Sequence, residues 1–160
     1  MHPTRNDLSE TIRAAMVQLL NRHLAAAIDL QLQAKHAHWN VRGPHFHPLH
    51  ELFDEVAEHA REHADMIAER AAALGGMAEG TLASVAPRTE LPPYPSTIVD
   101  GRSHVDALAK AVAWFAKLTR AGIDQAATAG DAVTADLLTE VARAADKDLW
   151  FVEAHLHAPD

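Results

Sequence analysis

The sequence predicts an all-α protein, a bundle of four long helices with one long connection in the middle. Three observations lead to this prediction. Glycine and proline gather in a few short stretches, the segments between them repeat apolar residues at helical spacing, and no segment alternates as a strand does. With 160 residues, 48% of them hydrophobic, the chain fits a single domain with a substantial core.

The first helix is expected over residues 8–39, after a short polar tail at 1–7. It opens at Ser9-Glu10, where a hydroxyl followed by an acidic residue resembles a capping box. Its apolar residues then recur at alternating spacings of three and four, so that they share one face. These residues are Ile12, Met16, Leu19, Ala27, Leu30, Ala34 and Ala37.

The second helix is expected over residues 48–74, because Gly75-Gly76 is a strong signal for a helix end. The third is expected over 102–127 and the fourth over 131–156. Apolar residues at helical spacing mark the buried faces of the last two. They are Val105, Leu108, Val112, Phe115, Leu138, Val141, Ala145, Leu149, Val152 and Leu156, and Trp114 and Trp150 are also expected in the core.

The lengths of the connections predict how the helices are ordered in space. Short links around 40–47 and 127–130 make antiparallel neighbours of the first and last pairs. The middle connection, 75–101, is too long for a turn, so it is expected to cross the bundle and leave helices two and three parallel. This single crossover is the plan of ferritin-like bundles, and residues 81–86 are expected to form a short helix within it.

Composition excludes several classes of function. The chain has no cysteine, which rules out thiolate metal sites, redox dithiols and cysteine nucleophiles. A net charge of -8 opposes general binding to nucleic-acid phosphates and favours cations, and twelve histidines offer many potential metal ligands. Because no apolar run could span a bilayer and the first residues do not form a signal peptide, we expect no membrane association. We expect a soluble cytoplasmic protein, which joins the nucleoid if it binds DNA.

The second predicted helix carries two polar pairs, each with a spacing of four residues. They are His50 with Asp54, and Asp65 with Glu69. On an ideal helix the four side chains fall within an arc of roughly 100°, so each pair can point into one pocket. The pairs are about 16 Å apart along the axis, however, so one metal site cannot use both pairs from the same helix.

Two interpretations of these pairs remain open. Any single pair of this kind more often belongs to the solvated face of an amphipathic helix. Alternatively, a second copy of the helix lies antiparallel across a two-fold axis. Then His50 and Asp54 of one chain face Asp65 and Glu69 of the other, and two identical sites result. The chain contains no Glu-x-x-His, the motif of di-iron sites within one bundle, which favours the second interpretation.

Four segments resemble the Dps mini-ferritins, and the likeness covers nearly the whole chain. They are residues 37–46 (AHWNVRGPHF), 49–54 (LHELFD), 65–70 (DMIAER) and 146–151 (DKDLWF). The resemblance implies a hollow homo-oligomer of twelve subunits built on two-fold dimers. It also implies a metal site at each two-fold interface, with some ligands from one subunit and the rest from its neighbour. The first subunit would supply His38, His50 and Asp54, and the neighbour Asp65 and Glu69.

The resemblance also implies an activity. Such proteins are ferroxidases that oxidise Fe(II) to Fe(III), typically with hydrogen peroxide, and store ferric mineral in the cavity, which protects against oxidative damage. The residue types alone would equally suit Zn, Mn or Co. Trp39 adjoins a ligand position and resembles a tryptophan close to the iron that intercepts radicals, although packing at an interface explains it as well.

The resemblance suggests further roles with plain alternatives. Glu51 and Glu55 resemble residues that nucleate mineral inside the shell, or they are simply solvated. Asp131 and Asp136 resemble acids that line the pore admitting iron, but Asp131 is equally a good helix N-cap. Five histidines depart from the family pattern and are expected to be exposed and to titrate between about pH 5 and 7. They are His36, His45, His47, His59 and His63.

Non-specific DNA binding is the main alternative function, because some members of the family bind DNA through lysine-rich tails. Residues 1–7 contain one arginine and no lysine, and residues 155–160 contain neither. We therefore expect weak or no DNA binding at neutral pH, and any binding near pH 5.5 would implicate the histidines. A metal store without redox activity is the second alternative.

Overall fold

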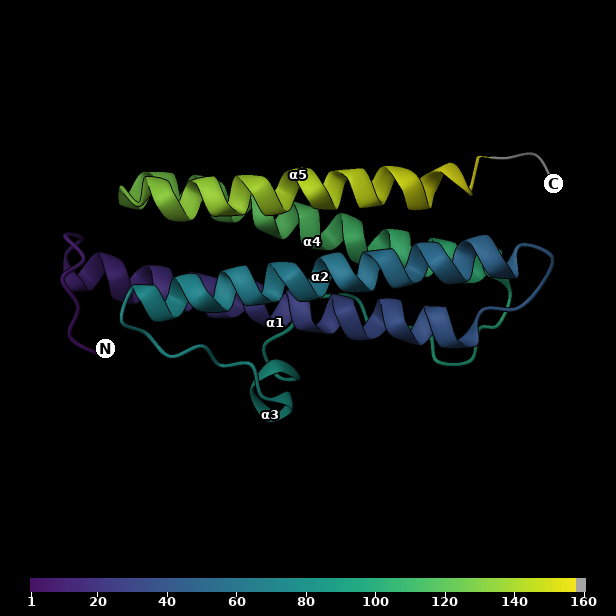
Figure 1. Cartoon of the computed structure of the whole chain (residues 1–160), viewed down its shortest axis with the longest axis horizontal. Helices are drawn as coiled ribbons and strands as arrows, with labels where there is room; N and C mark the ends of the chain where they lie inside the picture. Colours follow the sequence, from purple (N-terminus) through teal and green to yellow (C-terminus); the bar gives the residue numbers. More distant parts are fainter. Residues whose placement is uncertain (158–160) are drawn as a thin grey trace.

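The computed structural model describes residues 1–157, which form four long helices and one short helix (Figure 1). Between the helices of the described part there is no strand, only an isolated bridge that joins Arg42 to Asp100. The prediction of an all-α four-helix bundle is therefore confirmed. The helices are α1 (Glu10–Asn40), α2 (Phe46–Ala73), α3 (Leu82–Val85), α4 (Gly101–Ala129) and α5 (Ala132–Ala154).

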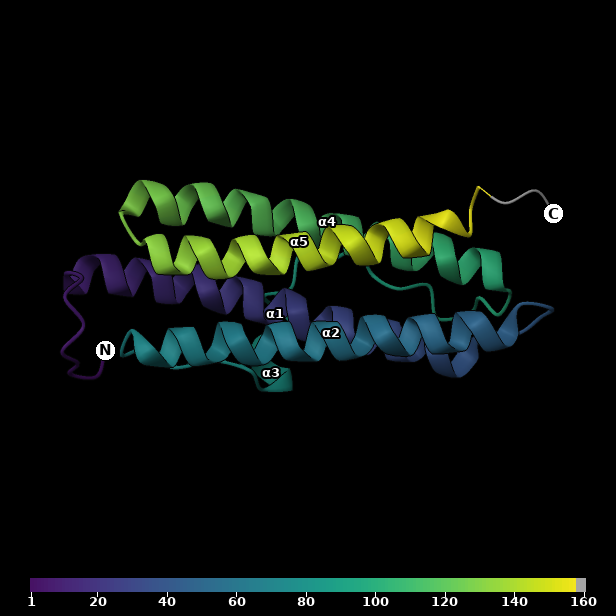
Figure 2. The same cartoon turned by 45° about the horizontal axis from the view of Figure 1, so that its top comes forward.

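The order of the helices follows from the connection lengths. α1 packs antiparallel to α2, and α4 packs antiparallel to α5 (Figures 1 and 2). The connection 74–100 runs from one end of the bundle to the other along α1, with α3 inside it, so α2 and α4 run parallel. This is the single crossover expected from the sequence.

Side chains and one glycine fix where the long helices begin and end. The hydroxyl of Ser9 accepts a hydrogen bond from the Ile12 amide at the start of α1, 3.3 Å away. At the start of α4 the Asp100 carboxylate accepts one from the Ser103 amide. Such caps satisfy amides that have no partner inside the helix. Gly130 ends α4 with a φ of 83°, a backbone conformation that L side chains rarely adopt.

The core runs the length of the bundle between the four long helices. Burying each large apolar side chain contributes about 1.5–3 kcal/mol. The predicted stripe of α1 is buried except for Ile12, which is half-buried. Many core positions of α1 and α2 are alanines, which lets these two helices approach closely. The largest fully buried apolar side chains are Phe53, Phe115, Leu20, Ile67, Leu74, Leu108 and Leu138.

The expectation that Trp114 and Trp150 belong to the core is wrong, since they are 44% and 67% exposed. Each lies one residue, about 100° of rotation, from a residue that faces inward. Phe115 and Leu149 occupy those inward positions. Trp150 instead packs edge-on against its neighbour Phe151 on the surface. No helix in the described residues is long and apolar enough to cross a membrane.

The crossover is tied to α1 by polar contacts along its path. Asn21 donates to the Met77 carbonyl and accepts from the Glu79 amide, each at 2.9 Å. Farther along, the Thr89 hydroxyl donates to Asp29 at 2.6 Å. Because these bonds satisfy polar groups on both partners, a loop that lacks regular structure is held in one position.

Candidate metal centre

The proposed ligands His38 and His50 form a reciprocal pair where α1 ends and α2 begins. Their rings stack with centroids 3.6 Å apart. His38 Nδ1 donates to the His50 carbonyl at 2.7 Å, and His50 Nδ1 donates to the His38 carbonyl at 2.8 Å. The His38 carbonyl is in the last turn of α1, where carbonyls lack an intrahelical partner, and His50 supplies one.

This arrangement fixes the orientation of both rings. A carbonyl oxygen can only accept, so each Nδ1 carries a hydrogen, and the neutral ring is held in the tautomer whose lone pair is on Nε2. No hydrogen bond among the described residues uses either Nε2. Metal-binding histidines are typically prepared in this way, with the second nitrogen bound to a carbonyl or carboxylate. The pair His38 and His50 is therefore suited to bind a divalent metal ion.

Asp54 lies on α2 one helical turn after His50. Its side chain is 52% exposed and accepts a hydrogen bond from the Lys35 ammonium at 2.5 Å. This bond, more than the nearby imidazoles, holds the pKa of Asp54 below its usual value, so the carboxylate is ionised at neutral pH. Lys35 thus competes with a metal ion for Asp54.

Asp65 and Glu69 lie farther along α2, and both are exposed. Asp65 borders a shallow hollow of about 300 Å³ between α1, α2 and the crossover, whose floor is largely apolar. The floor includes Leu24, Ile28, Ala64, Ala68 and Ala78. The structure therefore brings His38, His50 and Asp54 to one end of the α1–α2 pair and leaves Asp65 and Glu69 elsewhere. In residues 1–157 no three histidines or carboxylates are grouped closely enough to hold a metal ion.

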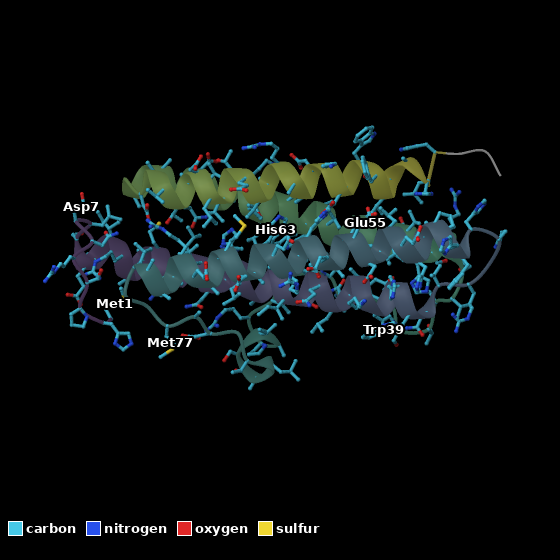
Figure 3. All side chains as sticks on the ribbon, viewed as in Figure 1. Met1, Asp7, Trp39, Glu55, His63 and Met77 are labelled. Atoms are coloured by element: carbon cyan, nitrogen blue, oxygen red, sulfur yellow. The ribbon has the colours of Figure 1, made fainter. Side chains whose placement is uncertain are left out.

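Two neighbours of the cluster were not predicted from the sequence. Lys35 is three residues before His38 on the same face of α1, but its bond to Asp54 depends on how α1 packs against α2. The Phe46 ring packs against His50 with centroids 5.0 Å apart, and it does so because α2 begins at Phe46 rather than at Pro48. Trp39 is 61% exposed on the side of the bundle that carries the crossover (Figure 3). Its role at the site stays a prediction.

Glu51 and Glu55 are exposed on α2, where Glu51 lies 3.4 Å from His47. Their part in nucleating mineral stays a prediction. His45 and His47 are exposed as expected, whereas His36 and His59 are half-buried. His59 binds the Asp148 carboxylate through Nδ1 at 2.9 Å.

The expectation of an exposed histidine is wrong for His63, which is 7% exposed between α2 and the ring of Phe115 (Figure 3). Burial lowers the pKa of His63 to about 4, because the charged ring would lose its solvation. His63 is therefore neutral at physiological pH and does not contribute to the surface charge.

Asp131 is buried and serves as the N-cap of α5, as one interpretation predicted. It accepts from the Thr134 amide at 3.0 Å and from the Arg70 guanidinium at 2.8 and 3.0 Å. Burial acts to raise the pKa of Asp131, but the bonds from Thr134 and Arg70 outweigh it and lower the pKa. The carboxylate is thus already bound, while Asp136 is exposed on the next turn. The pore stays a prediction.

Comparison with known proteins agrees with this description. The ferritin-like domain family matches residues 17–159. The "DNA protection during starvation protein" of Agrobacterium fabrum is 43% identical over 97% of this chain and 96% of its own length. Its namesake from Mycolicibacterium smegmatis is 34% identical over 94% of this chain and 82% of its own length.

Solved structures agree as well. A Mycobacterium smegmatis Dps structure superposes with a TM-score of 0.93 at 34% identity, covering 99% of this chain and 95% of the other. DpsC from Streptomyces coelicolor superposes with a TM-score of 0.92 at 32% identity, covering 100% and 92%. Since the fold, the family match and relatives of nearly equal length all agree, the chain belongs to the ferritin-like family and, within it, to the Dps mini-ferritins.

Proposed function

We propose that the protein is a ferroxidase that binds Fe(II) at sites shared by two subunits, oxidises it with hydrogen peroxide and stores the ferric product in a twelve-subunit shell. Consuming both reactants would protect the cell from oxidative damage. The observation that carries the proposal is the reciprocal His38–His50 pair, with both Nε2 atoms free beside the ionised Asp54.

The donor set suits the proposed reaction. Two imidazoles with a carboxylate bind Fe(II) well, and Zn, Mn or Co could occupy the same donors without being oxidised. Three carboxylates, from Asp54, Asp65 and Glu69, would stabilise Fe(III) more than Fe(II), because their attraction grows with the charge of the ion. A site completed by Asp65 and Glu69 of a second chain therefore favours oxidation.

The surface around the site supports assembly with a second copy. Large apolar side chains are exposed on the side of the bundle that carries α3, where Figure 3 labels Trp39 and Met77. Leu32 and Leu82 are 48% and 72% exposed. Exposed apolar surface next to an incomplete set of metal ligands is typical of a subunit interface.

Stopped-flow absorbance after mixing Fe(II) and peroxide tests the proposed activity. We expect a His50→Ala/Asp54→Ala variant to lose the fast formation of ferric product. A Glu140→Ala variant, which removes an exposed carboxylate of α5, serves as the matched control and should keep it. If the double variant oxidised iron as fast as the wild type, the ferroxidase proposal would fail.

A further inference from the structure

Tyr94 of the crossover and His104 of α4 form a hydrogen-bonded pair that the iron site does not explain. The phenol oxygen lies 2.7 Å from His104 Nδ1. His104 is fully buried on the first turn of α4, and Tyr94 is the only tyrosine in the chain. Burial raises the pKa of Tyr94, so the phenol keeps its proton at any physiological pH.

His104 is the neutral partner in this hydrogen bond. Burial, followed by the nearby charge of His36, lowers the pKa of His104 and keeps the ring neutral. Nε2 is buried without a hydrogen-bond partner among the described residues, whereas Nδ1 faces the phenol oxygen. In the tautomer that carries its hydrogen on Nε2, the Tyr94 hydroxyl donates to Nδ1, which is then placed to take the phenol proton.

The pair is close to the candidate metal centre without belonging to it. The Tyr94 ring packs edge-on against His36, with centroids 5.3 Å apart. His36 and His38 project from α1 about 200° apart and the phenol lies beyond His36, so at least the width of the helix, roughly 10–12 Å, separates it from His38. Electrons tunnel rapidly through protein over one helix width.

We propose that Tyr94 is a one-electron donor to the iron site and that His104 accepts its proton. This inference rests on the proposed oxidation of Fe(II) by peroxide, and it names the group that removes the radical formed when one ferrous ion reacts alone. Tyr94 has a hydrogen-bonded base, His104, that can take its proton as the electron leaves.

The chemistry balances in three steps. One Fe(II) reduces hydrogen peroxide to hydroxide and a hydroxyl radical and becomes Fe(III). The radical takes one electron from Tyr94 and becomes hydroxide, while the phenol proton moves from Oη to Nδ1 of His104, leaving a neutral phenoxyl radical beside an imidazolium. A second Fe(II) returns the electron and becomes Fe(III), and the proton returns to the phenol oxygen. The sum is two Fe(II) oxidised per peroxide, with no radical released.

Rapid freeze-quench electron paramagnetic resonance after mixing the Fe(II)-loaded wild-type shell with peroxide tests this directly. Any phenoxyl signal must come from Tyr94, since the chain has no other tyrosine. We expect the signal in the wild type and in a Trp114→Phe control, and none in Tyr94→Phe. Spin-trapped hydroxyl radical per iron oxidised should rise several-fold in Tyr94→Phe.

His104→Gln separates proton transfer from packing, because an amide oxygen can accept the phenol hydrogen bond but cannot take the proton. We expect this variant to form several-fold less phenoxyl than the wild type. If burial of glutamine prevents folding, a solvent deuterium isotope effect on phenoxyl formation in the wild type tests the same transfer. Its absence would overturn the role of His104.

The outcomes distinguish this inference from the proposed function. Wild-type protein that oxidises iron without any phenoxyl signal would overturn the inference and leave the ferroxidase intact. If the wild type oxidised no iron, the pair would still be tested in iron-free protein by azide radicals from pulse radiolysis. Phenoxyl absorbance that forms in the wild type and not in Tyr94→Phe would support the redox role of Tyr94. If the wild type formed no phenoxyl absorbance, that role would be overturned.

Discussion

A complementation experiment tests whether the metal site is shared between two chains. One variant, His38→Ala/His50→Ala, loses the histidine half of the site, and the other, Asp65→Ala/Glu69→Ala, loses the carboxylate half. Asp65 and Glu69 are exposed, so their removal should change the free energy of unfolding by less than about 0.5 kcal/mol each. Loss of the two bonds between His38 and His50 should cost about 1–3 kcal/mol, which a stable bundle tolerates.

The geometry sets the size of the expected rescue. A two-fold dimer with one chain of each variant has one site in which both halves are damaged and one in which both are intact. If chains of the two variants mix at random, half of all dimers contain one chain of each variant. Roughly a quarter of the wild-type number of sites should therefore be active in mixed shells.

The assay co-expresses the two variants with different tags, isolates shells that carry both tags and measures Fe(II) oxidation by peroxide in a stopped-flow instrument. Each variant alone should be inactive. Mixed shells that assemble but remain as inactive as their parents would refute the shared site. So would full activity in the Asp65→Ala/Glu69→Ala parent, since one chain would then suffice.

Four further predictions follow from single contacts. Lys35→Met should raise the affinity of the site for Co(II), measured by titration, because the ammonium no longer competes for Asp54. The pKa of His63 is 6.5 in the unfolded chain and about 4 in the folded protein, so the unfolded chain binds protons more readily between these values. The free energy of unfolding therefore decreases as the pH is lowered. Between pH 7 and pH 5, His63 should lower the free energy of unfolding of the wild type by about 2 kcal/mol, and His63→Leu should abolish this decrease, as measured by thermal unfolding at both pH values. Asp131→Ala should lower the free energy of unfolding in urea by about 3–5 kcal/mol, because Arg70 loses its buried partner, whereas Asp131→Asn should cost less. A gel shift at pH 8 should show no tight binding of duplex DNA, given the net charge of -8, and salt-sensitive binding there would contradict this.

The helices could be predicted because their signals are local. Periodicity over many residues outweighs any single position, and Gly75 and Gly130 adopt positive φ angles where the helices end. The start of α2 was placed two residues late at Pro48, because Pro is common in the first turn of a helix and the sequence does not say which position of that turn it takes. The histidine–carboxylate pairs could be predicted for the same local reason, since a spacing of four places two side chains on one face.

The features missed from the sequence have two causes: neglected helical phase, and contacts between helices that the sequence does not show. His63 shares the helical phase of the buried Val56, Ala60 and Ile67, a local signal that separates it from the half-buried His59 and was not weighed. Trp114 and Trp150 were misplaced because their size was weighed above their helical phase. The salt bridge from Lys35 to Asp54 required knowing how closely α1 and α2 pack.

The reciprocal hydrogen bonds between His38 and His50 have a consequence for how this centre can evolve. Many metal-binding imidazoles are oriented by a carboxylate side chain, which a single base change can remove. Here both acceptors belong to the main chain, so no substitution of a neighbouring residue can delete them. Sequence drift around the centre can alter charge and shape freely. The orientation of the two Nε2 atoms is lost only if the end of the bundle where α1 meets α2 unfolds.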